Sequence, residues 1–477
     1  MERLIRTGKV RTYSSAEITH SRIGIGFEKL DRGMFDPEKA YDQVAATGAK
    51  WVRIQSGWAR TEQEKGVYSF EWLDRIVDNL IRRGMQPWIC LCYGNGLYDE
   101  EAAKIFGAVG HPPRTEEQYR AWDRYIKAVV SRYRGKVQWY EVWNEPDGVW
   151  CWKTGPNGTD YGHLVLRTAK AIRAADPDAK VIGGSQCLFG LAWLHDVLAT
   201  GAGKVMDAFS YHNYAADERG LPALVAGSKA LLHQYNPAIK LIQGETGTQS
   251  RSGGAGALNP GAWTPLRQAK YMARHTITDF MSDIMFNSYF SCMDMCEALD
   301  GIVGNISTRK DYGYFGILAA EFDEDGIASG NFTPKISYRT FQVLCSVFQG
   351  NFEKIDLPLN FRPHSASPRA MFQKEPESAE MMFAGFQNAG GKAFAYWKPV
   401  DLLRETYAGT CTIHTCMKDK VRLVDLLDGS VYELPQEMDG IHDSTLYKGS
   451  REFLHLPLLD YPLLLTFGDF CSIDLNP

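Results

Sequence analysis

The sequence lacks the features that mark a membrane protein, a secreted precursor or a nucleotide-binding enzyme. No apolar run approaches the roughly 20 residues of a membrane-spanning helix. The N-terminal segment MERLIRTGKVRTYSS has neither the apolar core nor the small-residue cleavage site of a signal peptide. No G-x-G-x-x-G or Walker A motif follows the first apolar run. These absences predict a protein with no membrane partner and a cytoplasmic location, or a secreted protein if a leader has been removed.

An excess of one charge and the usual metal-binding spacings are also missing. The 477 residues carry a net charge of −5 with both signs interspersed, which gives no basis for a nucleic-acid partner. The ten cysteines form no C-x-x-C pair, and runs such as WICLCYG (88–94) predict buried free thiols, although Cys411 and Cys416 could bridge. No H-x-H or H-E-x-x-H spacing occurs, so we expect no metal and no other cofactor.

What the chain has instead is length and aromatic content. A chain of 477 residues is too long for one compact core and predicts two domains. Hydrophobic residues make up 44% and charged residues 23%, which is typical of a globular protein. Aromatic residues reach 12%, and such rings either fill a large core or form the platforms of a carbohydrate-binding cleft.

Eight short apolar runs alternate with amphipathic segments between residue 20 and about residue 345. Turn residues bound each run, as they bound buried parallel strands. The segments between the runs have helical periodicity, and in one of them Thr115 is a candidate N-cap and Gly135 a stop. This alternation predicts a (β/α)₈ barrel, because a doubly wound sheet would need a Gly-rich phosphate loop after its first strand. The eight runs are 22–27, 50–55, 87–93, 137–143, 180–185, 206–212, 240–245 and 286–293.

The pattern changes after about residue 350. Short strand-like segments separated by Gly, Asn and Asp turns replace the helical periodicity, which predicts an antiparallel β-sandwich. The first residues also alternate like a strand. We therefore predict an α/β protein in three parts: 1–20 as a strand that could join the sandwich, 21–348 as the (β/α)₈ barrel, and 349–477 as the sandwich.

Two glutamates stand where predicted barrel strands end. Glu145 follows the fourth run in WYEVWNEPDG, and Glu245 ends the seventh run in KLIQGET. The carboxyl ends of barrel strands carry catalytic groups, so both carboxylates would face the same mouth. Glycoside hydrolysis needs such a pair, one to protonate the leaving oxygen and the other to attack the anomeric carbon or activate water. Either motif alone is common in turns, and only their conjunction on two strands indicates chemistry.

These motifs resemble those of the retaining glycoside hydrolases of clan GH-A, whose catalytic glutamates end strands 4 and 7 of a (β/α)₈ barrel. Within the clan the chain resembles family 39, the group of β-xylosidases and α-L-iduronidases, although families 5, 30, 51 and 79 share much of the pattern. The similar segments are VRIQSGWARTEQEKGVYSFEWLD (52–74), FSYHNY (209–214), TPKISYRTFQVL (333–344) and LPLLDYPLLLTFG (456–468).

The resemblance implies roles for the residues around the two glutamates. Glu145 would be the acid/base and Glu245 the nucleophile. Asn144 would hold the 2-hydroxyl of the sugar, and Arg53 would keep the nucleophile ionised. Because an acid must hold its proton near neutral pH, we expect a raised pKa for Glu145, caused by an apolar wall or by the neighbouring carboxylate.

Further residues complete the pocket that the resemblance implies. Tyr214 would orient the nucleophile, and His212 would line the sugar subsite or lie near the acid/base. Trp150 and Trp152 would form the apolar wall or a platform for the leaving group, or else only pack their loop. Trp263, in a long Gly-rich loop, would close over the sugar.

One departure from the clan concerns the eighth strand. That strand often ends in a tryptophan that forms the floor of the reactive subsite. Here FNSYFSCMDMCEALDG (286–301) has no tryptophan and offers Asp294 and Glu297. Either the floor comes from elsewhere in the fold, or the subsite admits a bulkier or more polar sugar, with Asp294 able to bind a hydroxyl there.

These observations predict a retaining glycoside hydrolase that trims a β-linked glycoside or oligosaccharide from its end. Its partner would be the carbohydrate substrate, with a homo-oligomer left open. Two alternatives are a barrel that binds carbohydrate without catalysis and an endo-acting glycanase of the same clan. The missing histidine spacings disfavour a metal-dependent hydrolase. The sequence does not choose the sugar.

Overall fold

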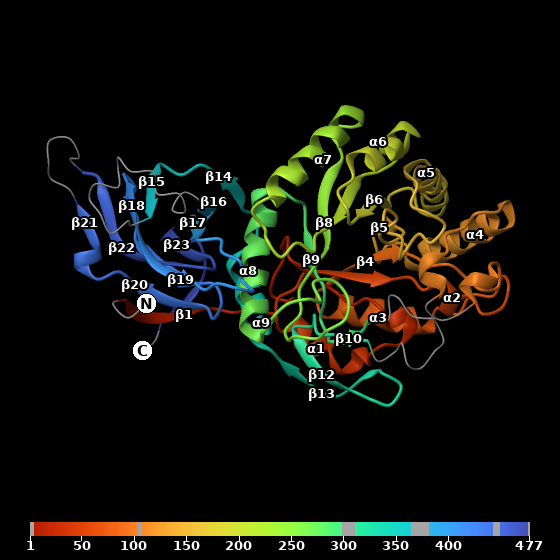
Figure 1. The fold of residues 1–477 in the computed structure, drawn as a ribbon, viewed down its shortest axis with the longest axis horizontal. Coiled ribbons are helices and arrows are strands. Elements are labelled where there is room, and N and C mark those ends of the chain that lie inside the picture. Colours follow the sequence, from red (N-terminus) through yellow and green to blue (C-terminus); the bar gives the residue numbers. More distant parts are fainter. Residues whose placement is uncertain (1–3, 104–106, 298–310, 364–380, 442–448, 476–477) are drawn as a thin grey trace.

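The chain folds into a barrel and a pair of antiparallel sheets, which lie side by side in Figure 1. The architecture is that of a computed structural model. The predicted fold class is confirmed, while the domain limits at residues 20 and 348 stay a prediction. The structure describes residues 4–103, 107–297, 311–363, 381–441 and 449–475.

The barrel consists of eight parallel strands in sequence order, and it closes where Ile25 pairs with Tyr289. An apolar cluster fills its interior, and the cluster draws on early residues of the strands, among them Trp88, Ile182 and Ala208. The N-terminal end of the barrel is therefore packed, and the opposite mouth is left for polar groups. The strands are β2 (Gly24–Gly26), β3 (Trp51–Gln55), β4 (Gln86–Leu91), β5 (Trp139–Val142), β6 (Lys180–Gln186), β7 (Ala208–His212), β8 (Lys240–Thr246) and β9 (Asn287–Tyr289).

Helices surround the barrel, and their ends follow the capping signals in the sequence. Thr115 caps α4 in a capping box with Gln118, and Gly135 follows the helix with a φ of 78°, a value that glycine adopts without strain. The helices are α1 (Tyr41–Ala45), α2 (Trp58–Thr61), α3 (Glu71–Arg82), α4 (Glu116–Tyr133), α5 (Gly158–Ala175), α6 (Leu191–Ala199), α7 (Leu221–Tyr235), α8 (Pro265–Met281) and α9 (Ile336–Val347).

Between the last barrel strand and α9, two short antiparallel pairs extend the chain beside the mouth. The first joins β10 (Met295–Cys296) to β11 (Tyr312–Gly313), and the second joins β12 (Leu318–Phe322) to β13 (Ala328–Pro334).

The remaining strands form an eight-stranded and a four-stranded sheet, whose facing side chains bury a second core that includes Phe394, Leu465 and Phe453. β1 (Ile5–Val10) pairs with strands of the larger sheet. In spatial order that sheet comprises β14 (Glu353–Ile355), β16 (Met382–Asn388), β17 (Gly391–Trp397), β23 (Leu463–Gly468), β19 (Val421–Asp425), β20 (Ser430–Glu433), β1 and β24 (Ile473–Leu475). The smaller sheet comprises β15 (Leu359–Pro363), β18 (Ala408–Thr415), β22 (Arg451–Leu459) and β21 (Asp439–Ile441).

A buried ion pair joins the barrel to the larger sheet. Nε and Nη2 of Arg274, in α8, each donate to the Glu218 carboxylate at 2.7 Å. The indole N–H of Trp397, at the end of β17, donates to the same carboxylate at 2.8 Å. Arg274 also donates to the carbonyl of Val400 at 2.9 Å. Because both charged groups are inaccessible to solvent, these bonds fix the orientation of the sandwich against α8.

Two properties of the whole chain bear on the predictions made from composition. None of the helices in the described ranges is both long and apolar enough to cross a bilayer. All ten cysteines lie within those ranges and are free thiols, Cys411 and Cys416 included.

Candidate active site

The two glutamates meet at the mouth of the barrel. Glu145 comes three residues after the end of β5 and has a φ of 45°, in the left-handed region that non-glycine residues seldom adopt. Glu245 is the penultimate residue of β8. One oxygen of each carboxylate lies within 4.8 Å of the other and of a ring nitrogen of His212. The topology therefore brings together residues from three different strands.

Arg53, on β3, connects most of this centre. Its Nη1 donates to Oε2 of Glu245 at 2.8 Å, its Nε to Oε2 of Glu141 at 2.8 Å, and its Nη2 to Oδ1 of Asn144 at 2.7 Å. The guanidinium is fully buried. Burial would lower the pKa of Arg53, but the charges of Glu141 and Glu245 raise it well above its ordinary value. A permanent cation therefore lies against the oxygen of Glu245.

His212 lies between the two glutamates. Its Nδ1 is 2.9 Å from Oε1 of Glu145 and 3.8 Å from Oε2 of Glu245, and its Nε2 is 3.0 Å from Oγ of Ser185. Burial disfavours a charge on His212, yet the carboxylates of Glu245 and Glu145 raise its pKa. One proton is thus shared within a buried histidine–carboxylate pair.

The pKa of Glu145 differs from the sequence expectation. Burial alone would raise it, as predicted, but the hydrogen bond and charge of His212 outweigh burial and lower it. The indole N–H of Trp150 also donates to Oε2 of Glu145 and favours the ionised form. The apolar wall and the neighbouring carboxylate, from which a raised pKa was expected, are outweighed by the cation next to the acid. The expected raised pKa is therefore wrong.

Tyr214 and Asn144 both line the pocket. The phenol of Tyr214 donates to Oε1 of Glu245, so both oxygens of that carboxylate are hydrogen-bonded. Burial and the charge of Glu245 raise the pKa of Tyr214 well above its ordinary value, which keeps the phenol a donor. Asn144 accepts from Arg53 and donates to Sγ of Cys151 at 3.5 Å.

Five predicted site residues are not among those that line the pocket. Arg53 and His212 still contact the two glutamates, whereas the other three are held by other partners. Trp152 is buried edge-on between Trp143 and Tyr161 and packs its loop, the alternative role considered above. Trp263 is also buried, and its N–H donates to the carbonyl of Leu258 at 2.8 Å. Asp294 is paired with Nζ of Lys335 at 2.5 Å. In each case a local partner takes the group that was expected to meet the sugar.

The pocket is about 660 Å³ in volume, and its lining includes charged residues that the strand-end argument left out. Glu28 and Lys29 follow β2 directly, and Nζ of Lys29 donates to Glu297 at 2.8 Å. Among the described residues Glu28 has no hydrogen-bond partner for either oxygen, and Nη1 of Arg53 is 3.5 Å away. Burial, reinforced by the charge of Glu245, raises the pKa of Glu28 to about 8. Glu28 and Lys29 directly follow the first strand, and that position was the signal that could have identified them.

Aromatic surface is present even though the eighth strand lacks a tryptophan. Phe290, immediately after β9, lines the pocket together with Phe315. Their ring centroids are 5.3 Å apart, and the ring of Tyr214 lies 6.5 Å from Phe290 and 6.1 Å from Phe315. Two phenylalanines and a tyrosine thus form an apolar wall on the Glu245 side of the cavity.

A metal ion is the other ligand that this geometry could suit. Glu145, His212 and Glu245 present three donor atoms within 4.8 Å of one another. Each of them is already engaged, however: Glu245 by Arg53 and Tyr214, and His212 by Glu145. The cation of Arg53 beside Glu245 also opposes a second positive charge, so the donor set suits a proton better than a metal ion.

Comparisons with known proteins agree with this architecture. Residues 34–242 match the model of the glycosyl hydrolases family 39. A β-xylosidase from Geobacillus stearothermophilus is 31% identical over 163 residues, 32% of each chain. A β-xylosidase from Caldicellulosiruptor saccharolyticus is 25% identical over 342 residues, 65% of this chain and 64% of that enzyme. The chain thus aligns with about a third of the first relative and just under two thirds of the second.

A solved family 39 glycoside hydrolase from the gut symbiont Bacteroides cellulosilyticus WH2 has the same fold, with a TM-score of 0.63 and 18% identity over 94% of this chain and 80% of that one. The chain thus has a closed (β/α)₈ barrel with an acidic pair at its mouth. Residues 34–242, less than half of the chain, are those that are similar to glycosyl hydrolase family 39. The matched residues include Arg53, Glu145 and His212 and end just before Glu245.

Proposed function

We propose that this protein is a retaining glycoside hydrolase that releases a β-linked sugar, with β-xylosides as the first substrates to test. The observation that carries the proposal is the approach of Glu145 and Glu245 to within 4.8 Å, oxygen to oxygen. Retaining glycosidases hold their carboxyl groups about 5–5.5 Å apart, whereas inverting enzymes hold them about 6.5–9.5 Å apart. The β-xylosidase relatives support the choice of sugar.

In the first step an oxygen of Glu245 attacks the anomeric carbon. The bond between that carbon and the glycosidic oxygen breaks, and the leaving oxygen takes a proton from Glu145. Glu145 receives that proton from Nδ1 of His212, 2.9 Å away, so that after this step Glu145 is ionised and His212 is neutral. Arg53 and Tyr214 position Glu245 for attack through one hydrogen bond to each oxygen. A covalent glycosyl-enzyme results.

In the second step water attacks the same carbon. Glu145 now acts as base and takes a proton from the water, the ester bond to Glu245 breaks, and the sugar leaves with its original anomeric configuration. The proton returns to the pair formed by Glu145 and His212, which restores the starting state.

The sugar itself would bind on the side of Glu245. Glu28, Lys29 and Glu297 line that side with hydrogen-bonding groups, and Asn144 is placed beside the acid/base. A sugar hydroxyl is the natural partner for the unpaired oxygens of Glu28, because an unsatisfied buried polar group costs about 1–3 kcal/mol. Phe290 and Phe315 offer an apolar surface to the C–H face of the ring.

The proposal is tested with a panel of aryl xyloside, glucoside, galactoside, arabinoside and glucuronide, with products followed by anomer-resolved NMR. We expect the anomer of the substrate to appear first, and Glu145→Gln and Glu245→Gln to lose at least about 10²-fold in rate. First appearance of the opposite anomer would rule out retention. If wild type were as inactive as both variants on every substrate, the barrel would instead be a carbohydrate-binding protein. The cytoplasmic location and the oligomeric state stay predictions.

A further inference from the structure

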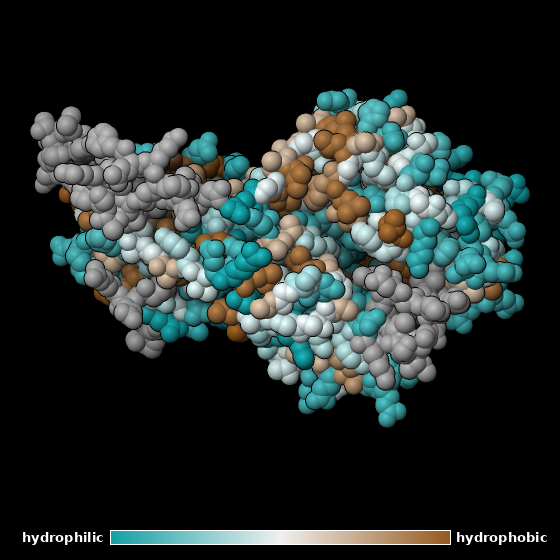
Figure 2. Space-filling view, viewed as in Figure 1, coloured by the Kyte–Doolittle hydropathy of each residue, from teal (hydrophilic) through white to brown (hydrophobic). Residues whose placement is uncertain are grey.

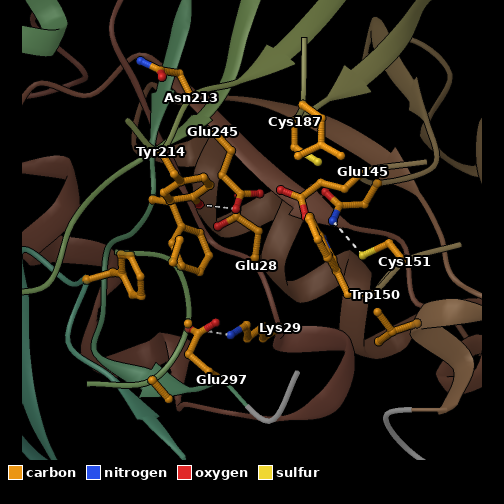
Figure 3. Close-up of a pocket in the computed structure, with 18 of the residues that line it drawn as sticks. Glu28, Lys29, Glu145, Trp150, Cys151, Cys187, Asn213, Tyr214, Glu245 and Glu297 are labelled. Atoms are coloured by element: carbon orange, nitrogen blue, oxygen red, sulfur yellow. Dashed lines mark hydrogen bonds and ion pairs between the residues drawn. The ribbon is translucent and has the colours of Figure 1, made fainter. Parts of the chain in front are cut away.

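The two sides of the pocket differ in chemical character. On the side of Glu245, Figure 3 shows Glu28, Lys29 and Glu297, all charged residues. On the side of Glu145, the same view shows Trp150, Cys151 and Cys187. The next residues of the chain, Leu188 and Phe189, also line the cavity. One half is therefore suited to a polyhydroxylated ring, and the other offers mainly apolar surface.

The loop that carries this apolar surface is fixed next to the acid/base. The carboxylate of Asp147, two residues after Glu145, accepts the backbone N–H of Cys187 at 2.9 Å and that of Leu188 at 2.8 Å. The thiol of Cys187 donates to the same carboxylate at 3.1 Å. Because Asp147 holds both backbone groups, the side chain of Leu188 cannot move far from Glu145.

Leu188 is 60% exposed despite this anchoring. Phe189 has a φ of 51° and packs on Tyr211 with ring centroids 5.4 Å apart, so the loop keeps a conformation that a phenylalanine seldom adopts. Leu224, in α7, is 50% exposed and lines the same pocket. Figure 2 shows apolar residues gathered over α7 on this face of the barrel. Exposed leucines held at the rim of a pocket are typical of a surface that a ligand covers.

The position of the acid/base identifies which part of the substrate meets this surface. Glu145 protonates the leaving oxygen, so the leaving group must extend on its side of the pocket. A second sugar there would require hydrogen-bonding partners. The side chains of Leu188, Phe189 and Leu224 offer none, the thiol of Cys187 is already bonded, and the indole N–H of Trp150 is bonded to Glu145. Lys153, in the same loop as Trp150, also lines the pocket and offers one ammonium group, so apolar side chains outnumber the available polar ones.

We propose that the leaving-group site binds an apolar aglycone, an alkyl or aryl group, in preference to a second sugar. This inference rests on the proposed hydrolase function, because only the roles of Glu145 and Glu245 distinguish the leaving-group side from the sugar side. The substrate class is thus a glycoside that joins one polar sugar to a hydrophobic alcohol or phenol, which the enzyme cleaves to release both.

The test uses n-alkyl β-D-xylosides from methyl to octyl, with the sugar exchanged if the aryl panel ranks another one higher. The leaving groups of this series have similar acidity, so differences in kcat/KM report binding of the chain. We expect kcat/KM to rise about two- to fourfold for each methylene that the wall covers, and xylobiose to be a poorer substrate than the octyl glycoside. Leu188→Ser and Leu224→Ser should each lower the octyl-to-methyl ratio of kcat/KM about five- to tenfold.

Leu191→Ser is the matched control. Leu191 begins α6, is 48% exposed and does not line the pocket, so its replacement should leave the octyl-to-methyl ratio within about twofold of wild type. A ratio near one in wild type, with xylobiose preferred, would overturn the proposal in favour of a sugar in this site. A chain-length dependence that all three serine variants retain equally would also overturn it, because the leucines would then not form the site.

Failure of the proposed function can be told apart from failure of this inference. Calorimetric titration with octyl and methyl 1-thio-β-D-xylosides, which resist cleavage, measures the preference without catalysis. A preference for the octyl compound that Leu188→Ser weakens and Leu191→Ser does not would support the apolar site even if no glycoside were hydrolysed. Equal binding of the two compounds would overturn it whatever the activity.

Discussion

Replacing His212 with asparagine tests how the proposed acid obtains its proton. Nδ1 of His212 lies 2.9 Å from Glu145 and 3.8 Å from Glu245 in a fully buried setting. Although burial opposes its charge, the carboxylates raise its pKa above the ordinary 6.5, and His212 in turn lowers the pKa of Glu145 from the ordinary 4.5. In wild type the pair formed by Glu145 and His212 therefore loses its shared proton only above pH 6.5, because the pKa of the histidine sets that limit.

The amide of His212→Asn cannot hold this proton, so protonation of the acid then depends on Glu145 alone. The alkaline limb of kcat/KM should move down by about two pH units, the difference between the ordinary pKa values of histidine, 6.5, and glutamate, 4.5. At pH 7 such a shift lowers kcat/KM by up to about 10²-fold, or about 2.7 kcal/mol of transition-state stabilisation. The measurement is the profile of kcat/KM against pH for an aryl glycoside from the panel.

His275→Asn is the control for loss of a buried imidazole. His275 lies in α8 outside the pocket lining, and burial together with the charge of Arg274 lowers its pKa to about 3. It is therefore uncharged over the range of the assay, and its replacement should leave the limb in place. A limb that stays or moves upward in His212→Asn would refute the reasoning, because the proton would then belong to Glu145 itself.

Three further outcomes follow from the structure. Glu28 has a folded pKa of about 8 against an ordinary 4.5, so the fold loses stability as pH rises through that window. Glu28→Gln should therefore be more stable than wild type at pH 8 but not at pH 4, by roughly 1.4 kcal/mol per pH unit at most. Equal thermal unfolding temperatures of the two proteins at both pH values would contradict this. Glu218→Ala leaves the buried charge of Arg274 unpaired and should lower the free energy of unfolding, measured in urea, by about 3–5 kcal/mol. A loss below about 1 kcal/mol would show that solvent reaches the ion pair of Glu218 and Arg274. Activity should be unchanged after dialysis against a chelator, since Arg53 disfavours a cation beside Glu245, and loss restored by added zinc would show the opposite.

The barrel was predictable because its signals are local. Each strand is a short apolar run bounded by turns, and helix limits such as Thr115 and Gly135 follow from hydrogen bonds and φ values within a few residues. The rule that catalytic groups lie at the carboxyl ends of barrel strands then selected Glu145 and Glu245, and the family resemblance added Arg53; the structure brings the three together.

The same rule failed where a side chain had a nearer partner. Asp294 follows the last strand, but Lys335 from the start of α9 pairs with it. Trp152 and Trp263 lie in loops, and their rings turn into the core rather than into the cavity. Glu28 follows the first strand and was overlooked, since one polar residue after a strand does not show whether it points inward.

The sequence by itself determined the order of strands and helices and the residue types at each strand end, because these depend on periodicity and neighbouring residues. Only the tertiary structure decided the pKa of Glu145, since the nitrogen that lowers it belongs to His212, two strands away around the barrel. The division of the pocket into a charged and an apolar side has the same origin. Leu188 stays in the pocket lining because Asp147 accepts its backbone N–H, a bond between residues 41 positions apart that no local pattern encodes.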